Sequence, residues 1–383
     1  MKTAGIICEY NPFHSGHAWQ IREIRRRLGE DTAIVCAMSG NFVQRGDFAV
    51  WEKYRRAGYA VRSGGPDLVF ELSLPAALGS AERFAAGAVS QLLSTGCLTH
   101  LSFGSECGDA DLLTRTAAVM QTAEYAALRG QTLESGIGYA AASHAALQEL
   151  FPKGAPLLRT PNDTLGIQYL RALGDHPIRI LPVQRIGAGH DAPPEDGFPS
   201  ASFLRGLLSD GQDVSAYLSP ETAEWPRQTL REHEREILSY LRRLSPSELA
   251  SLPDVSEGLE HRLYRAVRES GSIDAIVESC TSRRYARSRI RRLILCAWLG
   301  IRADLAALPP QYLRVLAFND RGRALLKTMK QTASLPVITK PLAAQSLTGP
   351  AQQLWSLDML ADDLYHCPDP AGSGWRQTAV YCR

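Results

Sequence analysis

Two histidines near the start of the chain, His14 and His17, are separated by Ser15 and Gly16 and follow a short apolar run, Ala4–Cys8. Residues three apart lie on the same face of a helix. The first turn of a helix has unpaired backbone N–H groups and a partial positive charge, so it attracts anions. The sequence therefore predicts a phosphate site, in which these donors would stabilise attack on the α-phosphate of ATP.

The helix that carries the two histidines is predicted from about Ser15 to Leu28. Ile21, Ile24 and Leu28 recur at helical spacing, and Gly29 follows as a stop. Short motifs recur by chance, so surface or capping histidines are the alternative interpretation. The position favours a ligand site, because a first strand that leads into a first helix ends at the carboxyl edge of a parallel sheet, where open α/β folds bind ligands.

The elements that must position this site follow an alternating pattern. Over the first two hundred residues, short apolar segments alternate with alanine- and leucine-rich segments of helical periodicity. This alternation is typical of an α/β fold with an open, Rossmann-like parallel sheet and crossover helices. The predicted strands cover residues 3–8, 32–38, 67–72, 99–103 and 178–183, and the predicted helices between them cover 81–93, 112–128 and 138–150.

The second half of the chain has a different character. Glycine, proline and acidic residues dominate 187–199, which predicts a loop beside the active site. Because a chain of 383 residues exceeds a comfortable single core, we predict two domains: a nucleotide-binding domain over 1–210 and a mainly helical domain over 211–383. The helices of the second domain are predicted at 226–244, 247–252, 259–270, 273–280, 285–299 and 312–330.

The composition is that of an ordinary globular protein, with 45% hydrophobic and 21% charged residues and a formal charge of +2. No apolar segment is long enough to span a membrane, and the first residues lack a signal peptide, so we expect a cytoplasmic protein. The eight cysteines include no C-x-x-C pair, which argues against a zinc ribbon or a redox dithiol. We predict no metal site built by the protein alone.

The segment Glu9–His17 resembles the H-x-G-H signature of the nucleotidylyltransferase superfamily, whose members form adenylates. Within that superfamily, the chain resembles the tRNA(Met) cytidine acetate ligase family over nearly its whole length. The further stretches that carry this resemblance are Met38–Gly46, Asp67–Leu72, Phe103–Glu106, Pro161–Gly166 and Thr281–Tyr285.

The resemblance implies an ATP-dependent reaction in two steps. ATP and acetate would form acetyl-adenylate and release pyrophosphate, with Mg²⁺ bridging the phosphates. The acetyl group would then pass to the wobble cytidine of elongator tRNA(Met), giving N4-acetylcytidine and AMP. Acetate acylates poorly until AMP becomes its leaving group, so the protein would contribute mainly positioning and charge stabilisation.

ATP would not be held by a P-loop, because the sequence G-x-x-x-x-G-K-[ST] does not occur. The segment 200–205 resembles the second nucleotide motif of the superfamily, with Ser202 where that motif often has threonine. A serine at a helix N-cap and an arginine one turn later could bind phosphate oxygens. The alternative interpretation is an ordinary helix capped by serine. The resemblance places ATP against Ile7, Cys8, Glu9, Tyr10, Asn11, Pro12, Phe13, His14, Gly16, His17, Gly104, Asn162, Arg185, Ser200, Ser202 and Arg205.

Three of these residues also lie where a ligand would be expected. Gly104 follows a predicted strand at the carboxyl edge of the sheet, where bare backbone would admit adenine or ribose. Asn162, after Pro161, is predicted to be a helix N-cap, which is also its plain structural interpretation. Arg185 follows the strand over 178–183 and could meet phosphate or ribose.

A polar loop after the second strand contains Gln44 and Arg45, which join His14 and His17 as candidate catalytic residues. This loop would line the same cleft as the histidines. It could orient the acyl donor or the incoming base, and a solvated surface loop is the alternative interpretation.

The segment 283–292 contains six arginines and one tyrosine, with no acidic residue between Glu278 and Asp304. Cations along an anchored helix suit the phosphate backbone of RNA, and an aromatic side chain can stack on a base. A solvated face with ion pairs to distant acids is the alternative. The candidate RNA-binding residues are Arg283, Arg284, Tyr285, Arg287 and Arg291.

Three functions remain open from the residues alone. An RNA-modifying ligase accounts for both the histidine motif and the arginine-rich segment. A small-molecule adenylyltransferase accounts for the histidine motif and leaves the arginine-rich segment unexplained. A non-enzymatic RNA-binding protein would have no reason to keep both histidines and the glycine.

Overall fold

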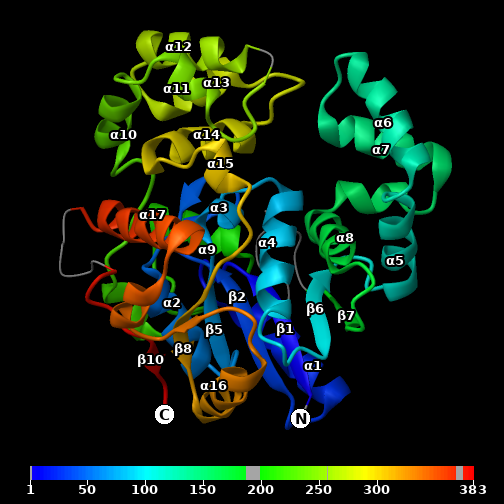
Figure 1. Cartoon of the computed structure of the whole chain (residues 1–383), viewed down its shortest axis with the longest axis vertical. Coiled ribbons are helices and arrows are strands. Elements are labelled where there is room, and N and C mark those ends of the chain that lie inside the picture. Colours follow the sequence, from blue (N-terminus) through cyan, green and yellow to red (C-terminus); the bar gives the residue numbers. More distant parts are fainter. Residues whose placement is uncertain (1, 187–198, 257, 368–373) are drawn as a thin grey trace.

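A mostly parallel β-sheet forms the centre of the computed structural model, which describes residues 2–186, 199–256, 258–367 and 374–383 (Figure 1). Apart from Pro199, the predicted loop at 187–199 lies outside these residues. The parallel part of the sheet has the order β5-β2-β1-β6-β7. It confirms the predicted strands as β1 (Thr3–Cys8), β2 (Ala33–Ser39), β5 (Leu68–Leu72), β6 (His100–Ser105) and β7 (Arg179–Gln184).

Helices cover both faces of this sheet, which is why β1 and β2 are buried along their whole length. Ile21 and Ile24 pack against one face, and Phe84 and Ala88 pack against the other. The first face carries α1 (Ser15–Leu28), as predicted, and α2 (Lys53–Arg62). The second face carries α4 (Ala81–Leu93), α8 (Pro161–Leu173) and α16 (Asp320–Thr332).

An arm of helices rises from the sheet between β6 and β7, beside α8 (Figure 1). The single helix predicted over 112–128 is wrong, because the chain turns at Met120 and Thr122 then caps a new helix by accepting the N–H of Tyr125. The predicted helix over 138–150 is confirmed. The arm consists of α5 (Ala110–Val119), α6 (Ala123–Glu134), α7 (Tyr139–Leu150) and the 3₁₀ helix η1 (Ala155–Arg159).

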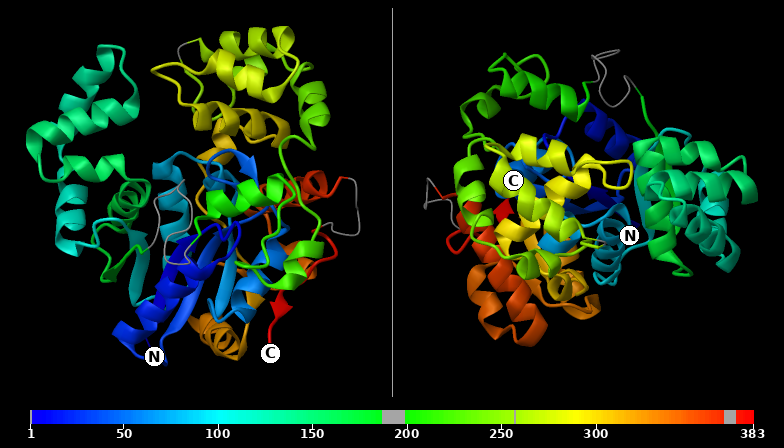
Figure 2. Two further views of the ribbon diagram at one scale, coloured as in Figure 1. Left: turned by 180° about the vertical axis from the view of Figure 1, so that it is seen from behind. Right: turned by 90° about the horizontal axis from the view of Figure 1, so that it is seen from above.

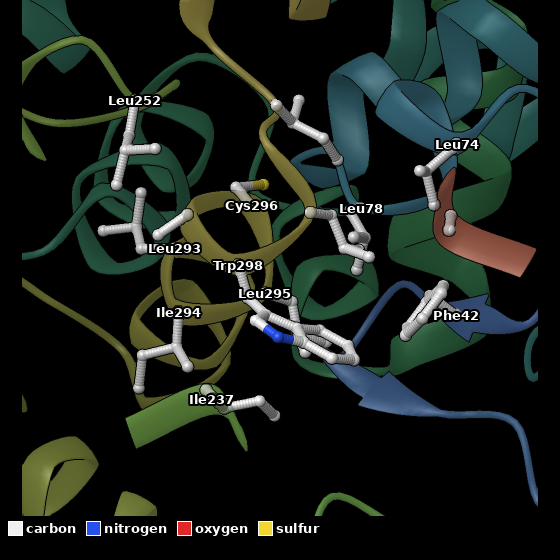
Figure 3. Packing of buried hydrophobic residues seen from close by; sticks show 14 of the residues in the cluster. Phe42, Leu74, Leu78, Ile237, Leu252, Leu293, Ile294, Leu295, Cys296 and Trp298 are labelled. Carbon is white, nitrogen blue, oxygen red and sulfur yellow. The ribbon is translucent and has the colours of Figure 1, made fainter. Parts of the chain in front are cut away.

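A second helical group lies across from this arm, as the two views of Figure 2 also show. Its helices share one apolar core, where Trp298 packs among Phe42, Leu78 and Ile237 (Figure 3). Helix α10 starts later than predicted, after an irregular segment. The group contains α10 (Glu234–Leu241), α11 (Pro246–Ala250), α12 (Leu259–Glu269), α13 (Ile273–Cys280), α14 (Arg287–Leu299) and α15 (Ala303–Ala306), with the short hairpin β3 (Phe42–Val43) and β4 (Asp47–Phe48) and α3 (Leu74–Ala77) packed below it.

The prediction of one helix over 312–330 is wrong in its first part. Leu313–Phe318 forms strand β8, which pairs antiparallel with β5, and helix α16 begins only at Asp320. The second half of the chain is therefore not uniformly helical, because β8 adds a strand to the central sheet. The domain boundary near 210 stays a prediction. The remaining elements are α9 (Ala201–Ser209), η2 (Pro220–Glu224), β9 (Val337–Ile338), η3 (Pro341–Ser346), α17 (Gly349–Tyr365) and β10 (Val380–Tyr381).

Among the helices in the described ranges, none combines the length and apolar character required to cross a lipid bilayer.

Candidate active site

A cavity of about 520 Å³ opens at the carboxyl ends of β1 and β6. Strand β2, next along the chain, lies on one side of β1 and β6 lies on the other, so the strand order reverses at this point, where open α/β sheets bind ligands. Fourteen of the predicted residues line it together: Ile7, Cys8, Glu9, Tyr10, Asn11, His14, His17, Gln44, Arg45, Gly104, Asn162, Arg185, Ser200 and Arg205.

Four predicted ATP-site residues do not line this main cavity. Gly16 borders a smaller adjoining cavity of about 50 Å³. Pro12 and Phe13 are buried. The ring of Phe13 stacks on that of His17 at a centroid distance of 5.7 Å, so Phe13 packs against the histidine. Ser202 Oγ accepts a hydrogen bond from Arg205 at 3.1 Å and so supports that arginine.

The two histidines form the start of helix α1. His14 is its N-cap, and His14 Nδ1 accepts the backbone N–H of Gly16 at 3.1 Å, while His17 Nδ1 accepts the backbone N–H of His14 at 3.3 Å. An Nδ1 that accepts such a bond has no proton, so a neutral imidazole has its proton on Nε2. Both rings, 3.9 Å apart, therefore present an Nε2–H donor.

Gly16, between the two histidines, leaves room for the ring of His14. A Cβ added to Gly16 would lie 2.9 Å from Cε1 of His14. Real Cβ atoms rarely come that close, so glycine leaves room for the His14 ring to fold back over the first turn.

The electrostatic surroundings keep both imidazoles neutral. Burial, helped by the charges of Arg185 and Arg205, lowers the pKa of His14 to about 4. Burial and His14 lower the pKa of His17 well below its usual value. At neutral pH the pair therefore acts through N–H donors, and the positive charge of the site comes from the arginines.

Helix α9 brings the second predicted motif to the same cavity. Ser200 is its N-cap, as predicted, and Ser200 Oγ accepts the N–H of Phe203 at 3.1 Å. One turn later, Arg205 donates to the carbonyl of Asn11 at 2.8 Å, which ties this helix to the loop before the histidines. The two motifs, almost two hundred residues apart, thus share one wall.

The loop ends around the cavity are held by a buried arginine on α2. Arg56 donates to the backbone carbonyls of Glu9, Ser39, Gly40 and Trp51. It therefore fixes the ends of β1 and β2 relative to each other, and it does not line the cavity.

The prediction for Asn162 is wrong in one respect. Thr160 is the N-cap of α8, and Asn162 is the second helical residue. Glu106, at the end of β6, accepts the Asn162 side chain at 2.6 Å and the backbone N–H of Asp163 at 2.9 Å. Asn162 is thus a fixed polar group beside Gly104 on the cavity wall.

The loop with Gln44 and Arg45 joins the cavity to the arginine-rich helix. Gly46 has φ of +76°, and a Cβ added there would lie 2.5 Å from the backbone nitrogen of Arg292. Arg292 also donates to the carbonyl of Gln44 at 3.4 Å. The start of α14 therefore packs directly on a loop that lines the cavity.

The arginine-rich segment is only partly exposed, and one of its arginines is paired with acids of other elements. Arg283, Arg284 and Arg287 are exposed. Arg291 forms ion pairs with Asp47 at 3.3 Å and Asp274 at 3.6 Å, acids that come from other elements.

The expectation that Tyr285 stacks on a base is contradicted by its burial. Tyr285 is 7% exposed, and its hydroxyl donates to the carbonyl of Ser256 at 3.3 Å. The guanidinium of Arg289 covers its ring at 4.9 Å. It anchors the turn before α14.

Sequence reasoning missed several cavity residues. Gln20 lies one helical turn after His17, a spacing that could have identified it. Tyr169 and Phe84 come from the apolar faces of α8 and α4, where nothing in the sequence separates a cavity wall from a core. The further missed residues are Ala81, Phe103, Leu158, Arg159, Thr160, Pro161, Thr164, Leu165 and Ala201.

Comparison with known proteins gives consistent results. A family model described as HIGH Nucleotidyl Transferase matches residues 1–377. The tRNA(Met) cytidine acetate ligase of Acetivibrio thermocellus is 34% identical, with 95% of this chain and 94% of that protein covered. The protein of the same name from Fervidobacterium nodosum is 32% identical, with the same coverage.

Two solved structures have the same fold over the full length. The apo crystal structure (form I) of Thermotoga maritima TmcAL superposes with a TM-score of 0.91 at 29% identity, covering 100% of both chains. The structure of that protein bound with alpha-thio ATP (form II) gives a TM-score of 0.90 at 29% identity and covers 100% of this chain and 99% of the other.

Proposed function

Since this chain belongs to the HIGH nucleotidyl transferase family, we propose that it is an ATP-dependent tRNA(Met) cytidine acetate ligase. It would activate acetate as acetyl-adenylate and acetylate the wobble cytidine of elongator tRNA(Met) to N4-acetylcytidine. The observation that carries the proposal is the cavity in which His14, His17, Arg185 and Arg205 converge where the strand order reverses.

The first step needs donors around the α-phosphate. The Nε2–H groups of His14 and His17 are preorganised by backbone hydrogen bonds, so they can stabilise charge that develops on the phosphoryl oxygens. Arg185 and Arg205 would neutralise the β- and γ-phosphates and favour departure of pyrophosphate. Acetate would attack from the side of Gln44 and Arg45, which line the cavity after β2.

The residues fit ATP better than they fit a protein-held metal. The described residues contain no group of three or more His, Cys, Asp or Glu side chains placed to hold an ion. Mg²⁺ would therefore be held mainly by the phosphates themselves, where it would supply charge neutralisation. The chain's own contribution is to bind the nucleotide and orient its α-phosphate.

The second step needs RNA at the mouth of the same cavity. The exposed arginines at the start of α14 offer charge to the phosphate backbone, and α14 packs on the loop that contains Gln44. A cytidine splayed from its loop could then enter the cavity, as single-stranded RNA commonly does in its binding proteins. This arrangement favours a ligase over a small-molecule adenylyltransferase.

Exchange of labelled pyrophosphate into ATP tests the first step separately. The proposal expects exchange that depends on acetate and is lost in His17→Ala. Exchange without acetate, or exchange driven by a nucleotide-like acceptor, would instead indicate a small-molecule adenylyltransferase.

A further inference from the structure

Glu9 is the only carboxylate among the described residues that line the cavity. Arginine side chains dominate the charge of the wall, with Arg45, Arg159, Arg185 and Arg205 all present. Like charges repel, so a carboxylate does not help to hold the phosphates of ATP directly. Glu9 therefore needs another partner, one that donates a hydrogen bond or gives up a proton.

The carboxylate of Glu9 is held at one oxygen. The backbone N–H of Gln44 donates to its Oε1 at 2.9 Å. No residue in the described part of the chain donates a hydrogen bond to its Oε2. Burial, and then the charge of Glu9, raises the pKa of Tyr169, so that phenol stays neutral beside it. Glu9 is thus oriented through one oxygen and keeps the other for a ligand.

Glu9 directly follows β1, and its hydrogen bond with Gln44 ties it to the β3–β4 hairpin. Gln44 lies in the turn of that hairpin, which comes after β2 in the chain, whereas Gly104 lies in β6. Strand β1 separates β2 from β6 in the sheet. The Gln44 contact therefore draws the Glu9 carboxylate toward the segment that follows β2, across β1 from the predicted adenine contact at Gly104.

The same side faces the arginine-rich helix. Gly46 packs on the backbone of α14, and Asp47 pairs with Arg291 at 3.3 Å. The segment 44–47 therefore connects Glu9 at one end to α14 at the other. RNA bound at the exposed start of α14 would deliver a base to the Glu9 side.

We propose that Glu9 receives the exocyclic amine of the target cytidine and accepts the proton that this amine loses on acetylation. The inference rests on the proposed function and assigns the base of its second step. A carboxylate is a common acceptor for the cytosine N4 amine, so the same contact would also favour cytosine over uracil, which has a carbonyl oxygen at that position.

The transfer step balances with this assignment. The N4 lone pair forms a bond to the carbonyl carbon of acetyl-adenylate, and the bond from that carbon to the phosphate oxygen breaks, so AMP leaves with the electron pair. The proton lost from N4 passes to Oε2 of Glu9 and then to water. The amine is a weak nucleophile because its lone pair is shared with the ring, so removal of this proton contributes to the rate.

Glu9→Gln tests the assignment, because glutamine keeps an oxygen for the Gln44 N–H and cannot accept a proton at the cavity side. Chemically prepared acetyl-adenylate is mixed with excess enzyme and an unmodified tRNA(Met) transcript, and formation of N4-acetylcytidine is followed in a single turnover. Acetate-dependent pyrophosphate exchange is measured on the same preparation, and exposed Glu124→Gln on α6 serves as the matched control.

The proposal expects the ratio of transfer to exchange to fall on the order of 100-fold in Glu9→Gln and to stay unchanged in the control. Transfer at the wild-type rate would overturn it. An equal loss of exchange and transfer would also overturn it and would place Glu9 at ATP or its metal. If the wild-type protein neither exchanges with acetate nor transfers from acetyl-adenylate, the proposed function itself fails.

Discussion

Two groups of charged side chains differ in the balance of positive and negative charge among the residues that the structure describes. In the buried group, Lys53 Nζ lies 2.7 Å from Glu71 and 2.5 Å from Asp362, and Arg314 Nη1 lies 3.1 Å from each of the same two carboxylates. Among the described residues that line the cavity, four are arginines and one, Glu9, is a carboxylate. The buried group is balanced within the protein, whereas the cavity is suited to an anionic ligand.

The comparison separates a structural role from a ligand-binding role. Lys53 and Asp362 are 309 positions apart, and their contact fastens helix α17 to α2 and the sheet. Burial also raises the pKa of neighbouring Asp358 to about 7, and Tyr312 donates a hydrogen bond to it. Dense charge of both signs, paired within the protein, is therefore a property of the core that holds the C-terminal segment.

Lys53→Met should have the largest effect on folding. It leaves Glu71 and Asp362 facing each other with only Arg314 between them, and an uncompensated buried charge costs about 3–5 kcal/mol. Urea denaturation measures the loss, with exposed Arg55→Met on the same helix as the control. A loss below about 1 kcal/mol in Lys53→Met would contradict a structural role for the cluster.

His17→Ala should have the largest effect on chemistry. Removing one preorganised donor costs about 10²–10³-fold in rate, because the developing charge on the α-phosphate loses a hydrogen bond. Acetate-dependent pyrophosphate exchange would report the loss, and binding of labelled tRNA should stay unchanged. Equal loss of exchange and RNA affinity would remove the distinction between the cavity and the RNA surface.

Reversing Arg284 and Arg287 to Glu should produce the opposite pattern. Both residues are exposed at the start of α14, so RNA affinity should fall about tenfold or more and its salt dependence should weaken. Exchange should be unchanged. Arg265→Glu, exposed on α12, is the matched control, and the same loss of affinity in that variant would indicate a general charge effect.

Because His14 is neutral when buried, the free energy of unfolding should depend on pH. This effect should be smaller than those of the substitutions above. The pKa of His14 is about 4 in the folded protein and about 6.5 in an unfolded chain. The unfolded chain therefore binds a proton more readily, so this contribution to stability is present above about pH 6.5 and is lost as the pH falls towards 4. The free energy of unfolding should fall less steeply over that window in His14→Asn, and parallel curves would contradict the assignment.

The sequence was sufficient where local pattern and fold agree. The five parallel strands are brief apolar runs between helical segments, and the histidine motif lies within one strand, turn and helix, so both could be predicted. The convergence of Ser200 and Arg205 on the same cavity came from the family resemblance, because no local signal joins segments this far apart.

The failures have a common physical cause, which is pairing between distant segments. Leu313–Phe318 is a short, mostly apolar segment whose local sequence does not distinguish strand from helix. Its pairing with β5, which is distant in sequence, makes it a strand. Around α14 no acid occurs nearby in sequence, yet Asp47 and Asp274 reach Arg291 from other elements. Glu9 could be placed near ATP, but its distinct position became visible only with the Gln44 contact.

The most direct test of the proposed activity follows the acetyl group itself. Purified protein is incubated with ATP, Mg²⁺ and carbon-13 acetate, with and without tRNA, and the nucleosides are examined by mass spectrometry. The proposal predicts label in N4-acetylcytidine only when ATP and tRNA(Met) are both present. Pyrophosphate release with no label in RNA would contradict it and would assign the cavity to a different acceptor.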